Sequence, residues 1–116
     1  MHEELIRKVL EKPLDKLAKE IREVNKKNNW DIVYSNDWQE SNHKIPAVLS
    51  LIHSEVSEGL EEFRKDNREE FLEEMADVVI RVLDCVGGLT DNFENIVIAK
   101  LNKNRNRGTR HGGKRV

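Results

Sequence analysis

The chain has 116 residues, of which 37% are hydrophobic and 5% aromatic, and its 20 basic residues nearly balance its 22 acidic ones. This length allows one domain, and such a polar chain buries only a modest part of its surface alone, which favours an oligomer. The apolar residues recur periodically, which argues against general disorder. A single cysteine excludes an internal disulfide, and no apolar run has the length of a signal-peptide core or a membrane span. We therefore expect a cytoplasmic protein with no membrane segment.

The first predicted element is an amphipathic helix that is interrupted or restarted at Pro13. Its apolar positions recur at near-helical spacing: Leu5, Val9, Leu14, Leu17, Ile21 and Val24. The segment 25–45 is predicted to be a long connection because it is rich in asparagine and other turn formers. Long ordered connections often carry function, and this one contains Trp30, Tyr34 and Trp38.

Two further helices are expected to form an antiparallel hairpin. Pro46 suits the first turn of one helix, whose apolar stripe is Leu49, Ile52, Val56, Leu60 and Phe63. After a polar turn near 65–68, the next helix carries its main stripe on Leu72, Met75, Val79, Leu83 and Val86. A second apolar flank of this helix is formed by Phe71, Val78 and Cys85, which is more than one partner helix requires. Gly87 and Gly88 are predicted to end it.

A last helix is expected after a cap at Thr90 or Asp91, with Phe93, Ile96, Val97 and Leu101 facing inward. The sequence therefore predicts an all-α bundle of about four helices per chain, completed by oligomerisation. We assign 1–103 to a single all-α domain and 104–116 to a basic, mobile tail.

Two carboxylate pairs lie on the central helices, Glu55 with Glu58 and Glu74 with Asp77. Residues three apart share a helix face, and in an antiparallel hairpin these two faces can confront each other. Converging carboxylates repel unless they bind protons or a cation, and oxygen ligands favour Mg²⁺ (Mn²⁺ is possible). Acidic residues three apart occur eight times in the chain, so a solvated helix face is the alternative. Arg81 is expected to pair with Asp77.

The ordered combination resembles the MazG-like all-α nucleotide pyrophosphohydrolases. It consists of Glu55-x-x-Glu58, fifteen residues, then Glu74-x-x-Asp77, followed by Lys100-x-x-x-Asn104-x-x-Arg107 and His111–Lys114. The resemblance covers about residues 46–114. It implies a Mg²⁺-dependent enzyme, a homodimer or homotetramer, that converts a nucleoside triphosphate to the monophosphate and pyrophosphate. It assigns the metal to Glu55, Glu58, Glu74 and Asp77. Ser54 replaces a glutamate that many members have, so Glu55, Glu58 and Glu62 are alternative water-activating bases.

Basic residues at the C-terminal end suit a triphosphate substrate. Residues 100–116 contain seven Lys and Arg and no acid, which complements the acidic helices. Lys100, Asn104 and Arg107 are the predicted phosphate ligands, and Trp38 is a candidate for stacking on the base. The rival interpretations are a phosphoribosyl-ATP pyrophosphohydrolase of the same superfamily and a non-enzymatic helical interaction module. A nucleic-acid binder is less favoured because the net charge is −2.

Overall fold

The computed structural model describes residues 11–107, and over this range the chain is all-α. Its helices are α2 (Pro13–Lys27), the short α3 (Asp37–Glu40), α4 (Lys44–Arg64), α5 (Arg68–Leu89) and α6 (Phe93–Asn106). The prediction of an all-α bundle with four substantial helices is confirmed. None of the helices in this range is both long and apolar enough to cross a membrane. The first half of the predicted N-terminal helix, with Leu5 and Val9, lies outside the described residues.

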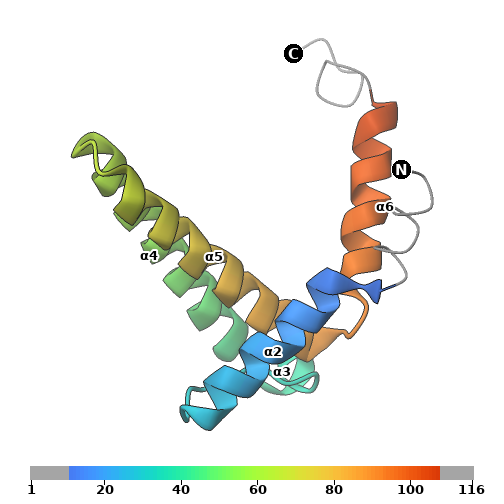
Figure 1. Ribbon diagram of the computed structural model, residues 1–116. Helices are drawn as coiled ribbons and strands as arrows, with labels where there is room; N and C mark the ends of the chain where they lie inside the picture. Colours follow the sequence, from blue (N-terminus) through green and yellow to red (C-terminus); the bar gives the residue numbers. More distant parts are fainter. Residues whose placement is uncertain (1–10, 108–116) are drawn as a thin grey trace.

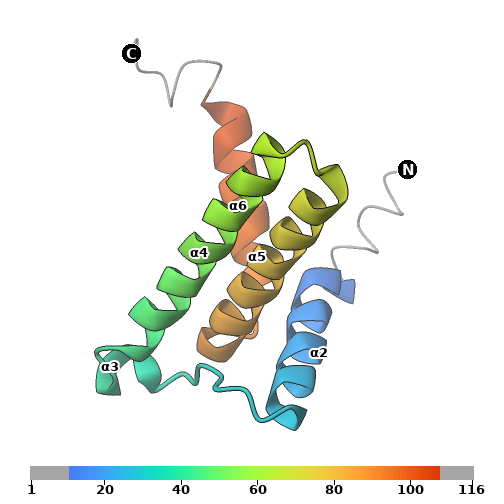
Figure 2. The same cartoon turned by 90° about the vertical axis from the view of Figure 1, so that its left-hand side faces the viewer.

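Helices α4 and α5 form the predicted antiparallel hairpin and lie side by side along their whole lengths (Figures 1 and 2). The turn between them is as short as the sequence indicates, since α4 ends at Arg64 and α5 begins at Arg68. Asp66 adopts a left-handed backbone conformation there, and the Asn67 side chain accepts a hydrogen bond from the Glu70 amide. This N-cap satisfies one of the free amides of the first turn of α5.

The faces that α4 and α5 turn toward each other are not the predicted apolar stripes. The less exposed positions of α4 follow a spacing of four and three: Val48, Ile52, Glu55, Gly59 and Glu62. Those of α5 include Phe71, Glu74, Val78 and Arg81, together with the buried Cys85. The predicted stripe residues Leu49, Val56, Leu60 and Phe63 of α4 and Leu72 and Val79 of α5 are instead exposed. We call these six residues the outer apolar face.

Gly59 explains why the contact runs along this face. It is buried, and a Cβ atom placed on it would lie 2.7 Å from the Met75 methyl carbon and 3.7 Å from Glu74 Cβ. The missing side chain therefore lets the two helices approach closely. The predicted stripes are therefore buried only in part. Ile52, Met75 and Val86 are partly buried and Leu83 is buried, whereas the residues of the outer apolar face are exposed.

Helix α2 packs across the C-terminal half of α5 (Figure 1). Ala18 of α2 and Leu83 of α5 are buried there, whereas Leu17 and Val24 of the predicted α2 stripe are exposed. Arg22 donates hydrogen bonds to the backbone oxygen and Oδ1 of Asp84, and buried Asn25 donates to Asp84 Oδ2. A polar network therefore fixes α2 on α5.

The connection 28–36 is held by apolar anchors that the sequence did not single out, Ile32 and Val33, which are both buried. Gly88 lies against it, because a Cβ atom there would be only 2.0 Å from the Val33 backbone oxygen. Helix α5 continues through both glycines to Leu89, so the prediction that they end it was wrong. Gly88 allows the connection to approach the helix.

Helices α2 and α6 cap each other. The Glu94 side chain accepts a hydrogen bond from the Leu14 amide in the first turn of α2, and Asp15 Oδ1 accepts one from the Glu94 amide in the first turn of α6. The side chains of the predicted caps, Thr90 and Asp91, accept no hydrogen bond from the amides of the first turn of α6. Thr90 Oγ1 accepts one from the Asn92 amide, just before the helix. The carboxylates at these N-termini also complement the helix dipoles.

Helix α6 packs mainly on α2 and diverges from the α4–α5 hairpin (Figure 1). Ile96, Val97 and Leu101 are exposed, so within one chain the prediction that they face inward was wrong. The helix extends to Asn106, which places Asn104 and Arg105 in regular structure. The remainder of the predicted tail, from residue 108 on, lies outside the described residues.

Candidate functional site

Three of the four predicted metal ligands converge where α4 faces α5. Glu55 and Glu58 of α4 and Glu74 of α5 each offer a carboxylate oxygen, and these three oxygens lie within 4.8 Å of one another. Glu55 and Glu74 are partly buried and Glu58 is exposed, so the cluster opens to solvent on one side. We call Glu55, Glu58 and Glu74 the carboxylate cluster. The sequence-based expectation that the two acidic helix faces confront each other agrees with this geometry.

Arg81 is the cation of the cluster. Its Nε and Nη2 atoms donate to the same oxygen, Glu55 Oε1, over 3.2 and 3.1 Å. The guanidinium and the Glu55 carboxylate are both largely shielded, with 29% and 13% of their side chains exposed. The prediction that Arg81 pairs with Asp77 was wrong. Arg81 lies one turn beyond Asp77 on α5, but it faces α4 and bridges the two helices.

The pKa values of Glu55 and Glu74 are shifted in opposite directions. The hydrogen bond with Glu55, together with burial and the nearby Glu58, raises the pKa of Glu74 to about 7. The same hydrogen bond from Glu74, with further stabilisation by Arg81, lowers the pKa of Glu55. Glu74 is therefore the carboxylate of this pair that binds a proton more readily, and Glu55 the one that stays ionised.

Glu74 also has an oxygen without a partner. Its Oε2 atom is buried and accepts no hydrogen bond. An unsatisfied buried carboxylate oxygen is costly, and such atoms in native proteins call for an explanation such as a bound ion. The other two in the described part of the chain, Asp15 Oδ2 and Glu94 Oε2, belong to the reciprocal helix caps of α2 and α6.

Asp77 stands apart from the three glutamates. It is exposed on α5 and is not among the carboxylates whose oxygens lie within 4.8 Å of one another. It does follow Glu74 by three residues, so it is on the adjacent part of the same helix face. Its role as a ligand stays a prediction.

The predicted phosphate-binding residues and the carboxylate cluster lie on different helices. Lys100, Asn104 and Arg107 are exposed on α6 or at its C-terminal end, and α6 diverges from the hairpin (Figure 1). Within the single chain these side chains and the cluster therefore belong to separate surfaces. His111 and Lys114 lie outside the described residues.

Trp38 is on α3, close to the N-terminus of α4, and 69% of its surface is exposed. It lines a shallow hollow together with Ser35, Asn36, Gln39 and Leu89. Its indole is therefore available for stacking and does not anchor the connection, a task that Ile32 and Val33 perform. Lys44 fixes the segment to α4 through ion pairs with Asp31 and Asp37.

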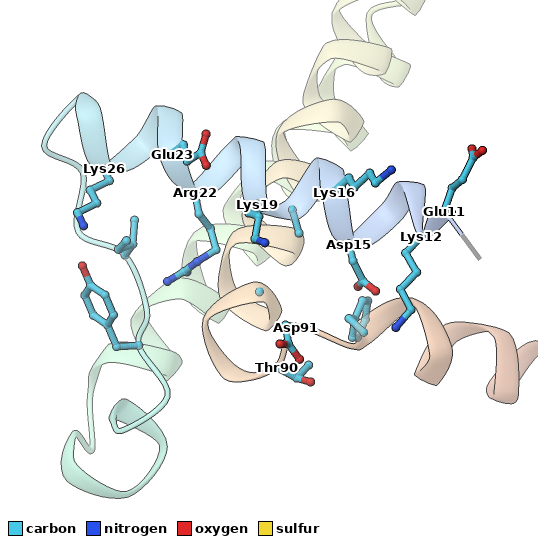
Figure 3. Close-up of a pocket in the computed structure, with 15 residues that line it drawn as sticks. Glu11, Lys12, Asp15, Lys16, Lys19, Arg22, Glu23, Lys26, Thr90 and Asp91 are labelled. Atoms are coloured by element: carbon cyan, nitrogen blue, oxygen red, sulfur yellow. The ribbon is translucent and has the colours of Figure 1, made fainter. Parts of the chain in front are cut away.

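A second cavity, of about 520 Å³, lies between α2 and the C-terminal end of α5 (Figure 3). Lys12, which precedes α2, and Lys19, Arg22 and Lys26 of α2 reach toward it. Thr90 and Asp91 lie on its opposite side. None of the site residues predicted from the sequence lines this cavity. The available signal was the spacing of seven between Lys19 and Lys26, which places them on one face of the helix.

The comparisons with known proteins add no relative. No protein-family model, no curated protein and no solved structure matches this chain. The fold and the side chains therefore define the protein as a small all-α protein with a carboxylate cluster between two antiparallel helices.

Proposed function

We propose that the protein is a Mg²⁺-dependent nucleoside triphosphate pyrophosphohydrolase, with the carboxylate cluster as its metal site. The observation that carries the proposal is the convergence of carboxylate oxygens from Glu55, Glu58 and Glu74 within 4.8 Å of one another. Glu74 also has a buried oxygen, Oε2, without a hydrogen-bond partner. The order of acidic and basic motifs along the chain, which resembles MazG-like enzymes, supports the same function.

The donor set suits a hard divalent cation. All three side chains offer carboxylate oxygens, and no cysteine or histidine belongs to the group. Mg²⁺ prefers a few carboxylates supplemented by water and substrate phosphate, and the open side at Glu58 leaves room for both. Asp77, one turn from Glu74, is proposed as an additional ligand. The neighbouring Glu55 and Glu58, which raise the proton affinity of Glu74, also favour a cation at the cluster.

The bound ion would offset the repulsion between the carboxylates and a triphosphate and make a coordinated water more acidic. The chain's own residues would accept the proton and bind the base. Glu55, held ionised by Arg81, and Glu58, which is exposed to solvent, are the candidates for accepting a proton from the attacking water. The stacking surface for a base would be Trp38.

A second copy of the chain would complete the site. Lys100, Asn104 and Arg107 belong to a helix that leaves its own hairpin, so a partner's α6 is the proposed source of phosphate ligands. The outer apolar face and the exposed apolar residues of α6 would be buried in this assembly. A homodimer or homotetramer is therefore part of the proposal.

The test is an assay of purified protein against the common ribo- and deoxyribonucleoside triphosphates, with Mg²⁺ or with EDTA. We expect Mg²⁺-dependent release of pyrophosphate and a nucleoside monophosphate from at least one nucleotide, without orthophosphate. Glu58→Ala should abolish the activity, whereas Glu61→Ala, a change of an exposed glutamate on the same helix, should retain it. No turnover in the whole panel would contradict the proposal.

Two rivals are separated by the same experiment. Phosphoribosyl-ATP added to the panel distinguishes the related pyrophosphohydrolase, which would use the same cluster but cleave that substrate alone. A non-enzymatic interaction module would show no turnover, and neither Mg²⁺ nor Glu58→Ala would change its thermal stability.

A further inference from the structure

We infer that the cavity between α2 and the C-terminal end of α5 is a binding site for a phosphate monoester with an apolar or aromatic body. The cavity is separate from the carboxylate cluster, since Glu55, Glu58 and Glu74 are not among the residues that line it. Its volume of about 520 Å³ lies in the range of small-molecule sites, roughly 300–1,000 Å³. The inference therefore does not depend on the proposed enzyme activity.

Three cationic side chains lie on the cavity side of α2. Lys19, Arg22 and Lys26 line the cavity, and their spacing of three and four places them in consecutive turns on one helix face. Figure 3 shows all three directed toward the cavity. Within residues 11–107 neither lysine forms an ion pair, so both ammonium groups can bind an external anion. The lysines lie about two helical turns apart, a span that two flexible side chains can close around one phosphate.

Arg22 fixes the inner wall of this cationic end. Its Nη1 atom donates to the backbone oxygen and Oδ1 of Asp84 over 2.7 and 3.1 Å, and only 16% of its side chain is exposed. Asp84 therefore balances the guanidinium, and the two lysines supply the charge for a ligand. A phosphate monoester carries nearly two negative charges at neutral pH, which matches two lysines, whereas a carboxylate carries one.

The acidic residues of the cavity do not occupy this end. In Figure 3 the Glu11 and Glu23 side chains point away from Asp91, which lies on the opposite side of the cavity. Asp15 lies in the first turn of α2, and its Oδ1 atom already accepts the Glu94 amide. An anion is therefore favoured next to the three cations.

Apolar groups form much of the remaining lining. Ala18 and Ile32 contribute buried side chains, and the aromatic rings of Tyr34 and Phe93 also line the cavity. The Arg22 guanidinium carbon lies 5.8 Å from the centroid of the Tyr34 ring, so this ring adjoins the cationic end. Small-molecule sites typically combine an apolar lining with a few polar groups that orient the ligand. A ligand with one phosphate and an apolar body complements both parts of this cavity.

The experiment is a nuclear magnetic resonance titration of the isotope-labelled full-length protein in EDTA at about pH 7.5. The probe is 1-naphthyl phosphate, compared with 1-naphthol, 1-naphthoate and inorganic phosphate. EDTA removes divalent ions, so the carboxylate cluster cannot bind a phosphate through a metal. We expect saturable shifts of the amides of α2 and of residues 87–91, with a dissociation constant of about 1 mM or lower. Each comparison compound lacks part of the recognised structure and should bind at least about fivefold more weakly.

Two double variants test the lysines. Lys19→Gln with Lys26→Gln should weaken the binding of 1-naphthyl phosphate by about fivefold or more, because two charge interactions are lost, and should leave the binding of 1-naphthol unchanged. The matched control is Lys27→Gln with Lys103→Gln, which removes two charges from exposed positions outside the cavity. This control should bind all four compounds as the wild-type protein does.

Several results would overturn the inference. They are no saturable shift with 1-naphthyl phosphate, shifts confined to the outer apolar face, and equal affinities of the two double variants. Equally tight binding of 1-naphthol or 1-naphthoate would overturn the preference for a phosphate, and equally tight binding of inorganic phosphate would overturn the role of the apolar lining. None of these results bears on the pyrophosphohydrolase activity, which is assayed with Mg²⁺ and through variants of the carboxylate cluster.

Discussion

The two sides of the α4–α5 hairpin have opposite chemical character. Where the helices face each other, three glutamates and an arginine lie among the packed side chains, with Gly59 allowing close contact. On the outer apolar face, Val56, Leu60 and Val79 are each about half exposed. A hydrophobic core alone would arrange these residues in the opposite way. Under the proposed function, the inner face holds the metal site and the outer face is covered by a second copy of the chain.

The largest effect is expected from the inner face. Glu74→Gln replaces one carboxylate oxygen of the cluster by an amide nitrogen with little change of shape. Under the proposed function it should lower Mg²⁺-dependent pyrophosphate release more than the roughly 10- to 100-fold caused by replacing residues that only support a metal ligand. Glu73→Gln, at an exposed neighbouring position, is the control and should stay near wild-type activity. Similar rates for both variants would contradict the role of the cluster.

The outer face is tested by Val79→Glu, which places a charge at a residue that is 50% exposed in the single chain. If a second copy covers this face, the substitution should dissociate the assembly, because an unpaired charge in an apolar interface is costly. Light scattering or analytical ultracentrifugation would then show the mass of one chain. Val24→Glu, at a residue of α2 with 55% exposure, should leave the mass unchanged. A wild-type protein that is already monomeric would contradict the assembly.

Packing between the helices is tested by Gly59→Leu. The added side chain would meet Met75 and Glu74 at the closest approach of α4 and α5, and overpacking of this kind costs about 1–3 kcal/mol of unfolding free energy. Ser57→Leu adds an apolar side chain at an exposed site of the same helix and should change stability by no more than about 0.5 kcal/mol. Urea unfolding of both variants measures the difference, and equal midpoints would mean that the hairpin does not require a glycine at this position.

The smallest effect concerns pH. The pKa of Glu74 is raised to about 7 from the ordinary value of 4.5, chiefly by its interaction with Glu55. The stability contributed by neutral Glu74 is therefore complete below about pH 4.5 and is lost as pH rises through 7. In EDTA, the melting temperature of the wild-type protein should fall between pH 5 and pH 8 relative to that of Glu74→Gln. Parallel pH profiles of the two proteins would contradict this assignment.

Much of the fold was predictable because it depends on local signals. Helical periodicity located α4, α5 and α6, and turn-forming residues located the hairpin loop at residues 65–67. Periodicity did not reveal which face each helix buries, since that depends on the partner. Gly88 shows the same limitation. A glycine at the end of an apolar run is typical of a helix terminus, but Gly88 lies within α5, where its missing side chain leaves room for the backbone of Val33.

The candidate site was predictable in part for the same reason. The spacing of three placed Glu55 and Glu58 on one face, and an antiparallel hairpin brings such a face to that of Glu74. That Arg81 pairs with Glu55 could not be predicted, because it depends on how the two helices are rotated relative to each other. The reciprocal caps of Asp15 and Glu94 likewise join residues 79 positions apart, which no local pattern indicates.

The sequence by itself determined that this protein is all-α, that its central helices form a hairpin, and which carboxylates can meet, because helix periodicity and short turns are local properties. Only the tertiary structure decided that the acidic faces lie inside the hairpin while Leu60 and Val79 lie outside. It also placed α6 away from the carboxylate cluster. The physical reason is that helix packing follows the closest approach of whole surfaces, and a single buried glycine can set that approach against the pattern of apolar residues.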